Sequence, residues 1–221
     1  MNNQVTKFLS MIGVDIRYIS IYNKLIFINN LKFSKFSHRR EDLFLAKHPE
    51  YKVIRSKTFQ KMCIKASRIL SKSLNPRDKV LIIKNKNCAD LLLYLILEPY
   101  QRKYGIQIIT TENPNLKNDY KMNSIASPLT LDQEVINIIK QIFGGKKIEQ
   151  KSINIKKKDT KIIYPLINIP EAWIEKWAEK DHLQCSNPPL DHETESLLKF
   201  LEHYIPDVRE NMLKSAMYLS K

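Results

Sequence analysis

The chain has 221 residues, of which 43% are hydrophobic, and a formal net charge of +14 at pH 7. This apolar content is enough to bury a core and excludes a largely disordered chain. No apolar run approaches the ~20 residues that span a bilayer, and the N-terminus lacks a secretory pattern, so we expect a cytoplasmic protein without a membrane partner.

The excess positive charge is confined to the first half of the chain. Residues 1–110 contain 21 Lys and Arg against 7 Asp and Glu, whereas residues 111–221 contain 16 basic and 16 acidic residues. An AT-rich genome is the alternative cause of a high lysine content, but it would also have raised the charge of the second half. Because clustered cations gain affinity by releasing counterions from phosphates, the asymmetry favours RNA binding.

Cysteine and histidine usage predicts neither a metal centre nor a catalytic residue. The cysteines Cys63, Cys88 and Cys185 lie too far apart for a CxxC pair, and none has a histidine at ligand spacing. We therefore expect unpaired thiols in a reducing compartment, no metal site and no cofactor. The five histidines lie beside no candidate nucleophile and form no paired-ligand motif.

The N-terminal segment contains two β-rich runs, DIRYISIY and KLIFINNLKF, that meet near Asn23 and Lys24. This arrangement predicts a β-hairpin. We assign residues 1–54 to a basic N-terminal extension that carries the hairpin and helix, and residues 55–221 to an α/β domain.

A helix is predicted from an N-cap at Ser56 to about Ser73, with one buried apolar stripe. The opposite face is a line of basic residues with no acidic residue between them: Lys57, Lys61, Lys65, Arg68 and Lys72. Like charges at this spacing repel by ~0.2–0.5 kcal/mol per neighbouring pair. A phosphate backbone lying along the helix would relieve that repulsion, and a solvated surface face is the alternative.

The next segments have the order of a β-α-β unit with a parallel sheet. VLIIK at 80–84 is typical of a buried strand, ADLLLYLILEPYQRK of an apolar helix, and GIQIIT of a second strand. Residues 111–128 are rich in Asn, Ser and Pro and predict a long surface loop.

The second half of the chain is predicted to be mostly helical. A helix follows Thr130 and ends at Gly144 and Gly145, and a basic segment that includes Lys146 and Lys147 leads to the strand KIIYPL. These lysines form a second basic patch or belong to a flexible linker. Three helices close the chain, with Trp173 and Trp177 expected in the core.

Residues 162–221 contain 6 basic and 10 acidic residues. This end should therefore face away from RNA or toward a basic protein surface.

The turn between the first strand and its helix is where such units bind nucleotide phosphates. Here it contains no glycine, and a carboxylate lies where phosphate oxygens should be placed. Its residues are Asn85, Lys86, Asn87, Cys88, Ala89 and Asp90. The four glycines of the chain form no G-x-G-x-x-G or Walker-type loop elsewhere, so binding of ATP phosphates is disfavoured.

The order of elements resembles the PP-loop, adenine-nucleotide α-hydrolase-like proteins, and among them the tRNA 2-thiolation proteins. VLIIKNKNCADLLLYLIL occupies the place of that family's strand, loop and helix, with Asn85, Lys86 and Asn87 where the family has Ser-Gly-Gly. LDQEVINIIKQIFGGKK, KIIYPLINIPEAWIEKWAEK and the closing helices resemble later elements, over roughly residues 55–221. The resemblance implies a PP-loop α/β fold, a parallel sheet flanked by helices, with a degenerate loop and a helical C-terminus.

The closing helices are most similar to the second subunit of the eukaryotic cytoplasmic thiolation complex, which is regarded as lacking its own catalysis. That resemblance implies a non-catalytic subunit that holds tRNA and forms a heterodimer with an active PP-loop thiolase. The tRNA contacts would come from the basic line, from Lys84 and Lys86, and from Lys146 and Lys147. Cys185 lies near the place of a cysteine in active relatives, but it lacks companion cysteines and receives no catalytic role.

Two other functions remain open at this stage. One is a diverged adenylating tRNA-modifying enzyme in which Lys84, Lys86 and Asp90 replace the usual phosphate contacts. The other is a general RNA-binding module, for which the nearby aromatic residues Tyr51, Phe59 and Tyr104 would have to be exposed for base stacking.

Overall fold

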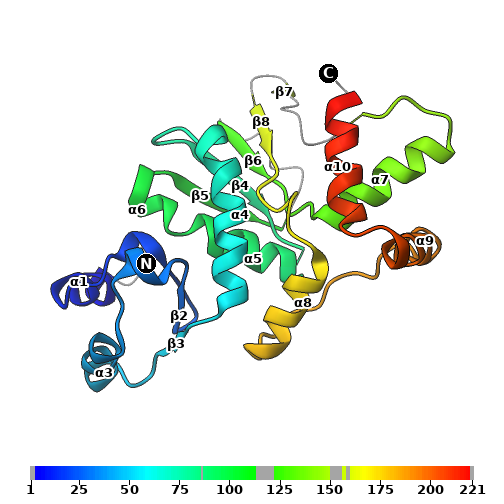
Figure 1. Cartoon of the computed structure of the whole chain (residues 1–221). Coiled ribbons are helices and arrows are strands. Elements are labelled where there is room, and N and C mark those ends of the chain that lie inside the picture. Colours follow the sequence, from blue (N-terminus) through cyan, green and yellow to red (C-terminus); the bar gives the residue numbers. More distant parts are fainter. Residues whose placement is uncertain (1–2, 86, 113–121, 150–155, 158–159, 220–221) are drawn as a thin grey trace.

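The computed structural model describes residues 3–85, 87–112, 122–149, 156–157 and 160–219. Its strands form two sheets, a small N-terminal sheet and a larger, mainly parallel sheet. Figure 1 shows the N-terminal helices at one end of the molecule and the last two helices at the other, with the larger sheet between them. Within the described residues, no helix is long and apolar enough to cross a membrane.

The N-terminal sheet contains the predicted hairpin. β1 (Ile19–Tyr22) pairs antiparallel with β2 (Leu25–Ile28), and β3 (Lys52–Ile54) lies parallel to β2. Both turn residues, Asn23 and Lys24, have positive φ angles, 44° and 61°, as a two-residue hairpin turn requires. The hairpin prediction is confirmed.

Helix was expected in this extension, but the positions of the helices around the sheet were not predicted. They are α1 (Asn3–Met11), a 3-10 turn η1 (Ile16–Tyr18), α2 (Leu31–Ser34) and α3 (His38–Lys47). The predicted β-runs extended into η1 and α2, which was wrong: side chains of Asp15 and Asn30 cap these short turns and end the strands.

The N-terminal unit is bonded tightly to the rest of the chain. The Ser20 hydroxyl donates to the Leu95 carbonyl at 2.5 Å, and the Arg102 guanidinium donates to the carbonyls of Ile16 and Ile19 at 2.8 and 2.7 Å. Phe27 also belongs to the main hydrophobic core. The boundary between residues 54 and 55 stays a prediction.

The larger sheet has the strand order β5-β4-β6-β8-β7. Its strands are β4 (Lys79–Ile83), β5 (Gln107–Thr111), β6 (Ser124–Ala126), β7 (Lys156–Lys157) and β8 (Thr160–Ile163), all parallel except β7. The predicted parallel β-α-β unit is confirmed. β6 corrects the predicted loop at 111–128: it is short and has no apolar run, and only its pairing with β4 and β8 makes it a strand. Residues 113–121 of that loop lie outside the described residues.

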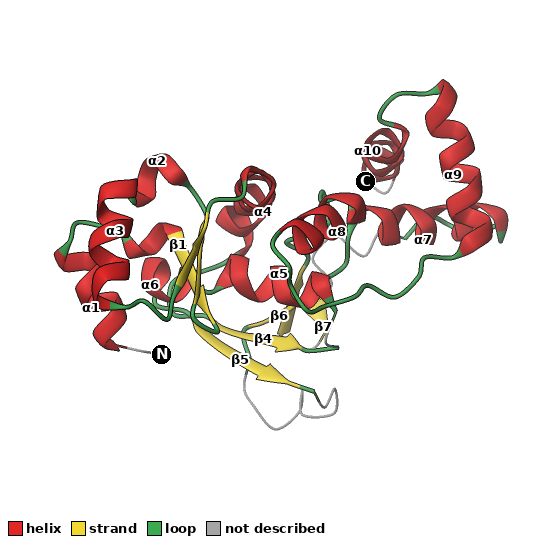
Figure 2. Cartoon of the chain, turned by 90° about the horizontal axis from the view of Figure 1, so that it is seen from below, coloured by secondary structure: helices red, strands yellow, loops and turns green. Residues whose placement is uncertain are grey.

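Three helices cover one side of this sheet and enclose the main core. α4 (Lys57–Ser73), α5 (Cys88–Leu97) and α8 (Glu171–Lys180) lie on the same side of the sheet in Figure 2, and their buried side chains share one core with Val80 and Ile82 of β4. α4 is the predicted helix, with the Ser56 hydroxyl accepting from Phe59 N–H. The apolar helix after β4 ends earlier than expected, and a short α6 (Tyr100–Tyr104) begins after Pro99.

The C-terminal helices form a second core of their own. α7 (Leu131–Phe143), α9 (His192–Tyr204) and α10 (Val208–Leu219) contribute its buried side chains. α7 starts after Thr130 and is followed by Gly144 and Gly145, as predicted, and the structure adds a capping box between Thr130 and Gln133. Trp177 is fully buried and Trp173 packs against the main core, so both tryptophans lie where expected.

Candidate functional site at the β4–α5 turn

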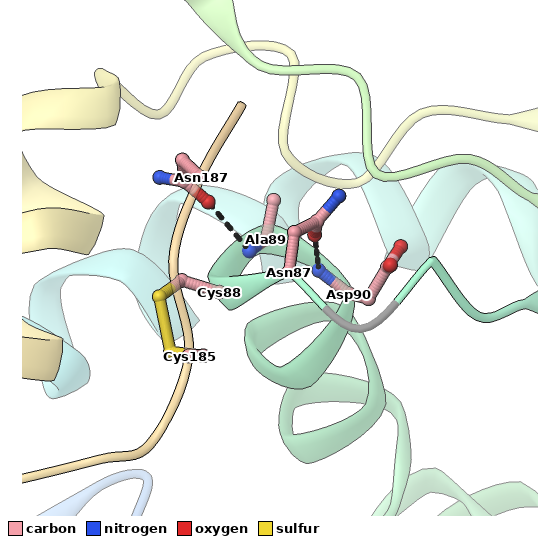
Figure 3. Close-up of a disulfide and its surroundings, with 6 residues drawn as sticks. All are labelled: Asn87, Cys88, Ala89, Asp90, Cys185 and Asn187. Atoms are coloured by element: carbon pink, nitrogen blue, oxygen red, sulfur yellow. Dashed lines mark hydrogen bonds between the residues drawn. A yellow bond between two sulfur atoms is a disulfide. The ribbon is translucent and has the colours of Figure 1, made fainter. Parts of the chain in front are cut away.

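The turn between β4 and α5 is closed by side chains of the protein itself. Asn87 Oδ1 accepts a hydrogen bond from Asp90 N–H at 2.7 Å, and Asp90 Oδ2 accepts from Asn85 N–H at 2.6 Å. Asn187, distant in sequence, places its Oδ1 3.3 Å from the N–H group of Ala89 (Figure 3). Both asparagines therefore occupy donors that a phosphate would need.

The first turn of a helix offers four free N–H groups, and these make it an anion site. In α5 two of these four donors are bonded to asparagine side chains: Ala89 N–H donates to Asn187 Oδ1, and Asp90 N–H donates to Asn87 Oδ1. Leu91 N–H makes the first regular helical bond, to the Asn87 carbonyl at 3.2 Å. A phosphate could reach the two capped donors only by displacing these side-chain oxygens.

A disulfide fixes the segment that carries Asn187. Cys88, the first residue of α5, is bonded to Cys185, and their Cα atoms are 5.0 Å apart. Figure 3 shows the 185–187 segment running past the start of α5. The expectation of unpaired thiols was wrong for these two cysteines, because 97 residues separate them and no local spacing signals that they meet.

Asp90 adds negative charge to the same turn. Its side chain is buried, and burial raises the pKa of the carboxyl group above its usual value, although the N–H groups of Asn85 and Asn87 oppose that shift. Asp90 Oδ1 has no hydrogen-bond partner among the described residues. This carboxylate therefore works against the binding of a phosphate at the turn.

A hollow of about 300 Å3 opens beside the turn. We call residues 184–187, which follow α8 and carry Cys185 and Asn187, the strap. The hollow is lined by side chains from the hairpin, the turn, α5 and the strap: Tyr22, Lys84, Asn87, Asp90, Leu91, Tyr94, Gln184 and Cys185. Lys84 is the only cation among these described lining residues, and its Nζ lies 5.6 Å from the centre of the Tyr94 ring. Sequence reasoning missed Tyr22, Gln184 and Asn187, because only the folded chain brings them to the turn.

The basic line on α4 is only partly free for a ligand. Lys57, Lys61, Arg68 and Lys72 are exposed, as predicted. Lys65 instead donates to the Asn168 carbonyl at 3.0 Å, lies 3.7 Å from Glu210, and has its Nζ 4.8 Å from the centre of the Trp173 ring. Its role is thus structural as well as electrostatic, which the helical spacing alone did not indicate.

Of the other predicted basic residues, Lys84 lines the hollow beside the turn. Lys146 and Lys147 are exposed after the C-terminus of α7, and Lys86 lies outside the described residues. Of the suggested stacking residues, Phe59 is fully buried and Tyr51 packs against the N-terminal core, which corrects those two suggestions. Tyr104 is 38% exposed.

The fold is found in a solved structure of known activity. The U34-tRNA thiolase NcsA from Methanococcus maripaludis, solved with its [4Fe-4S] cluster, matches 78% of this chain and 83% of its own with a TM-score of 0.59 at 17% identity. The two proteins share an α/β fold in which helices flank a parallel sheet. At this identity the likeness concerns the fold alone.

A sequence comparison found a relative that is similar over a shorter stretch of the chain. A protein named "Probable sulfurtransferase" from Methanocaldococcus jannaschii is 32% identical over 94 residues, which are 42% of this chain and 28% of that protein. The chain therefore matches less than a third of the relative's length. No protein-family model matches the sequence.

The cysteines do not fit an iron–sulfur cluster like that of the structural neighbour. Such clusters are held by several converging thiolates. Here Cys88 and Cys185 are bonded to each other, and Cys63 is buried on α4, where its Sγ accepts from Asn29 Nδ2 at 3.5 Å. Burial raises the pKa of the Cys63 thiol to about 12, so it is not a ready thiolate. No group of three metal-ligating side chains occurs within the described parts of the chain.

Proposed function

We propose that the chain is a tRNA-binding, non-catalytic subunit of a tRNA wobble-uridine thiolation complex and supports an active PP-loop thiolase. One observation carries the proposal: two of the N–H groups at the start of α5 are bonded to asparagine side chains of the protein itself. The thiolase fold and the sulfurtransferase relative support a connection to tRNA thiolation. The exposed cations on α4 support RNA binding.

Exposed aromatic residues on the last helices support a protein partner. Phe200 and Tyr204 are 61% and 66% exposed, and their ring centroids lie 5.2 Å apart on α9. Large exposed apolar groups that adjoin one another are typical of protein interfaces. We expect the paired change Phe200→Ser and Tyr204→Ser to abolish co-purification with the thiolase and to leave tRNA binding unchanged.

Two measurements test the absence of catalysis. The isolated chain should show no ATP–pyrophosphate exchange. When expressed in its native organism, it should co-purify with a PP-loop enzyme. Exchange activity above that of a heat-denatured sample would refute the non-catalytic role. An absent partner in the pull-down would refute the heterodimer.

The RNA surface is tested by reversing the charges of Lys61, Arg68 and Lys72. Lys65 stays unchanged because its ammonium group contacts Glu210 and Trp173. The triple change to Glu should weaken tRNA binding by more than about tenfold, since each phosphate contact adds to the salt-dependent affinity. The control, which changes the exposed Lys176, Lys180 and Lys214 to Glu, alters the net charge equally and should bind nearly as the unchanged chain does.

The disulfide favours a second candidate, an active sulfur-transferring enzyme. Cys88 and Cys185 meet directly beside the β4–α5 turn, and a thiol pair at the end of a central strand is chemically competent for exchange with sulfur donors. Reduction of the pair would be the first step of such an activity. Transfer of sulfur to tRNA by the reduced chain alone, lost in Cys185→Ser, would favour this enzyme over the scaffold.

A further inference from the structure

A second hollow, lined by several basic side chains, lies at the opposite end of the strands from the β4–α5 turn. It measures about 450 Å3 and is lined by side chains of η1, α4 and α6: Arg17, Tyr18, Ser67, Arg68, Ser71, Tyr100, Lys103 and Tyr104. The carbonyl of Tyr104 accepts from Arg77 N–H at 2.9 Å just before β4 begins, which places the hollow where β4 and β5 start.

We propose that this hollow binds one nucleotide unit of an RNA, holding its phosphate between Arg68 and Lys103 while the unpaired base stacks on Tyr104. The proposal rests on the RNA-binding function proposed above and names a contact point for it.

Lys103 is the central cation of the hollow. Its Nζ lies 4.3 Å from the ring centre of Tyr18 and 4.9 Å from that of Tyr100, so two aromatic faces flank the ammonium group. Among the residues that the structure describes, Lys103 has no ion pair with a carboxylate. Burial lowers the pKa of Lys103 below its usual value, and the charge of Asp15 only partly opposes that shift. A phosphate in the hollow would supply a further anion.

The rest of the lining also favours an anion. No Asp or Glu is among the described lining residues. Arg17 already pairs with Asp15 through Nη2–Oδ2 and Nε–Oδ1 contacts of 2.8 and 2.9 Å. The exposed guanidinium of Arg68 has no such partner within the described chain and faces the same hollow as Lys103. Two cations thus remain available to a single phosphate group.

Tyr104 supplies the aromatic face for a base. It lies on the last turn of α6, is 38% exposed, and is held edge-on by Tyr100 with a centroid distance of 5.5 Å. A ring fixed in this way loses little freedom when a base stacks on it. Single-stranded RNA is commonly bound by such a pairing of basic groups and aromatic rings, whereas paired bases inside a duplex are not available for it.

The test compares a short single-stranded oligouridylate with an RNA duplex of equal length, together with unfractionated tRNA. Tyr104→Ala should weaken binding of the single strand about tenfold and leave the duplex unchanged, and Tyr104→Phe should restore binding. Lys103→Met should reduce the salt dependence of tRNA binding by roughly one phosphate contact, whereas Lys103→Arg should keep it. Lys176→Met, which removes an exposed lysine on α8, is the matched control, and thermal melting confirms that each variant folds.

The outcomes separate this hollow from the broader proposal. If the unchanged chain binds tRNA and the Lys103 and Tyr104 variants bind equally well, the hollow is refuted while RNA binding stands. Equal losses in Lys103→Met and Lys176→Met would also refute it, since they would indicate a diffuse charge effect. Failure of the unchanged chain to bind any of the three RNAs would overturn both proposals.

Discussion

The helices α5 and α7 begin in comparable positions but with opposite electrostatic environments. Each follows a parallel strand of the larger sheet, and each is capped by a side chain, Asn87 in α5 and Thr130 in α7. Each also carries a buried aspartate in its first turn, Asp90 in α5 and Asp132 in α7. The two helix starts differ in what neutralises that aspartate.

At α7 the carboxylate belongs to a complete charge network. Asp132 forms an ion pair with the buried guanidinium of Arg209, which also contacts Glu195 and Glu202 at 3.0 and 2.7 Å. Asp132 Oδ2 accepts from Glu171 N–H at 2.6 Å as well, so the network joins α7, α8, α9 and α10. Asp90 has only main-chain donors and one unpartnered oxygen among the described residues. We infer that the α7 start is a structural joint, whereas the carboxylate at the α5 start is held by main-chain hydrogen bonds alone.

Removing the guanidinium should break the α7 joint and give the largest effect. We expect Arg209→Met to lower the free energy of unfolding by about 3–5 kcal/mol, because it leaves Asp132 and Glu195 buried without their cation. Urea denaturation measures the loss. Lys214→Met, on the exposed side of the same helix, should change stability by less than about 0.5 kcal/mol. A cost equally small in both variants would contradict the joint.

Removing the disulfide tests how firmly the strap closes α5. Because the bond joins residues 97 positions apart, Cys185→Ser should lower the free energy of unfolding by about 2–4 kcal/mol. A reducing agent should lower the melting temperature of the unchanged chain and have no effect on the variant. If the unchanged chain melts at the same temperature with and without the reducing agent, the bond contributes nothing to the closure.

The charge of Asp90 should have the smallest effect, and one that depends on pH. Burial raises the pKa of its carboxyl group, so ionising Asp90 lowers the stability of the folded chain. This loss is absent at low pH and develops as the pH rises from the unfolded-state pKa through the folded-state pKa. Asp90→Asn keeps an oxygen acceptor for Asn85, so its stability relative to the unchanged chain should increase with pH by up to about 1 kcal/mol. Thermal melts across the acidic range would measure this difference.

Asp191 provides a control of opposite sign. Hydrogen bonds from Thr194 and from Lys140 lower the pKa of the Asp191 carboxyl group to about 2. Its ionised form therefore contributes stability above the unfolded-state pKa and loses it as the pH falls, so Asp191→Asn should be the less stable protein at neutral pH. Parallel pH profiles for the two variants would contradict the assignment of Asp90.

The sequence predicted those parts of the fold that depend on local pattern. α4 and α7 follow from their apolar spacing and from the caps Ser56 and Thr130, and the β4–α5–β5 unit follows from its alternation of apolar runs. β6 was missed because its three residues, flanked by polar ones, owe their strand form to two neighbouring strands.

Only the part of the candidate site that lies in the β4–α5 turn itself was predictable from the sequence. The missing glycines and Asp90 were visible in the sequence, but the arrival of Cys185 and Asn187 depends on the path of the chain through α7 and α8. Likewise Lys65 belongs to the basic line by spacing, yet its neighbours Glu210 and Trp173 come from helices far along the chain. Contacts of this range leave no periodic signal.

The two sulfurs of the disulfide differ in how readily a reductant can reach them. Cys88 is almost fully buried whereas Cys185 is half-buried, so an incoming thiol reaches the Cys185 sulfur first. Attack there forms the mixed disulfide on Cys185 and releases Cys88 as the leaving thiolate at the start of α5.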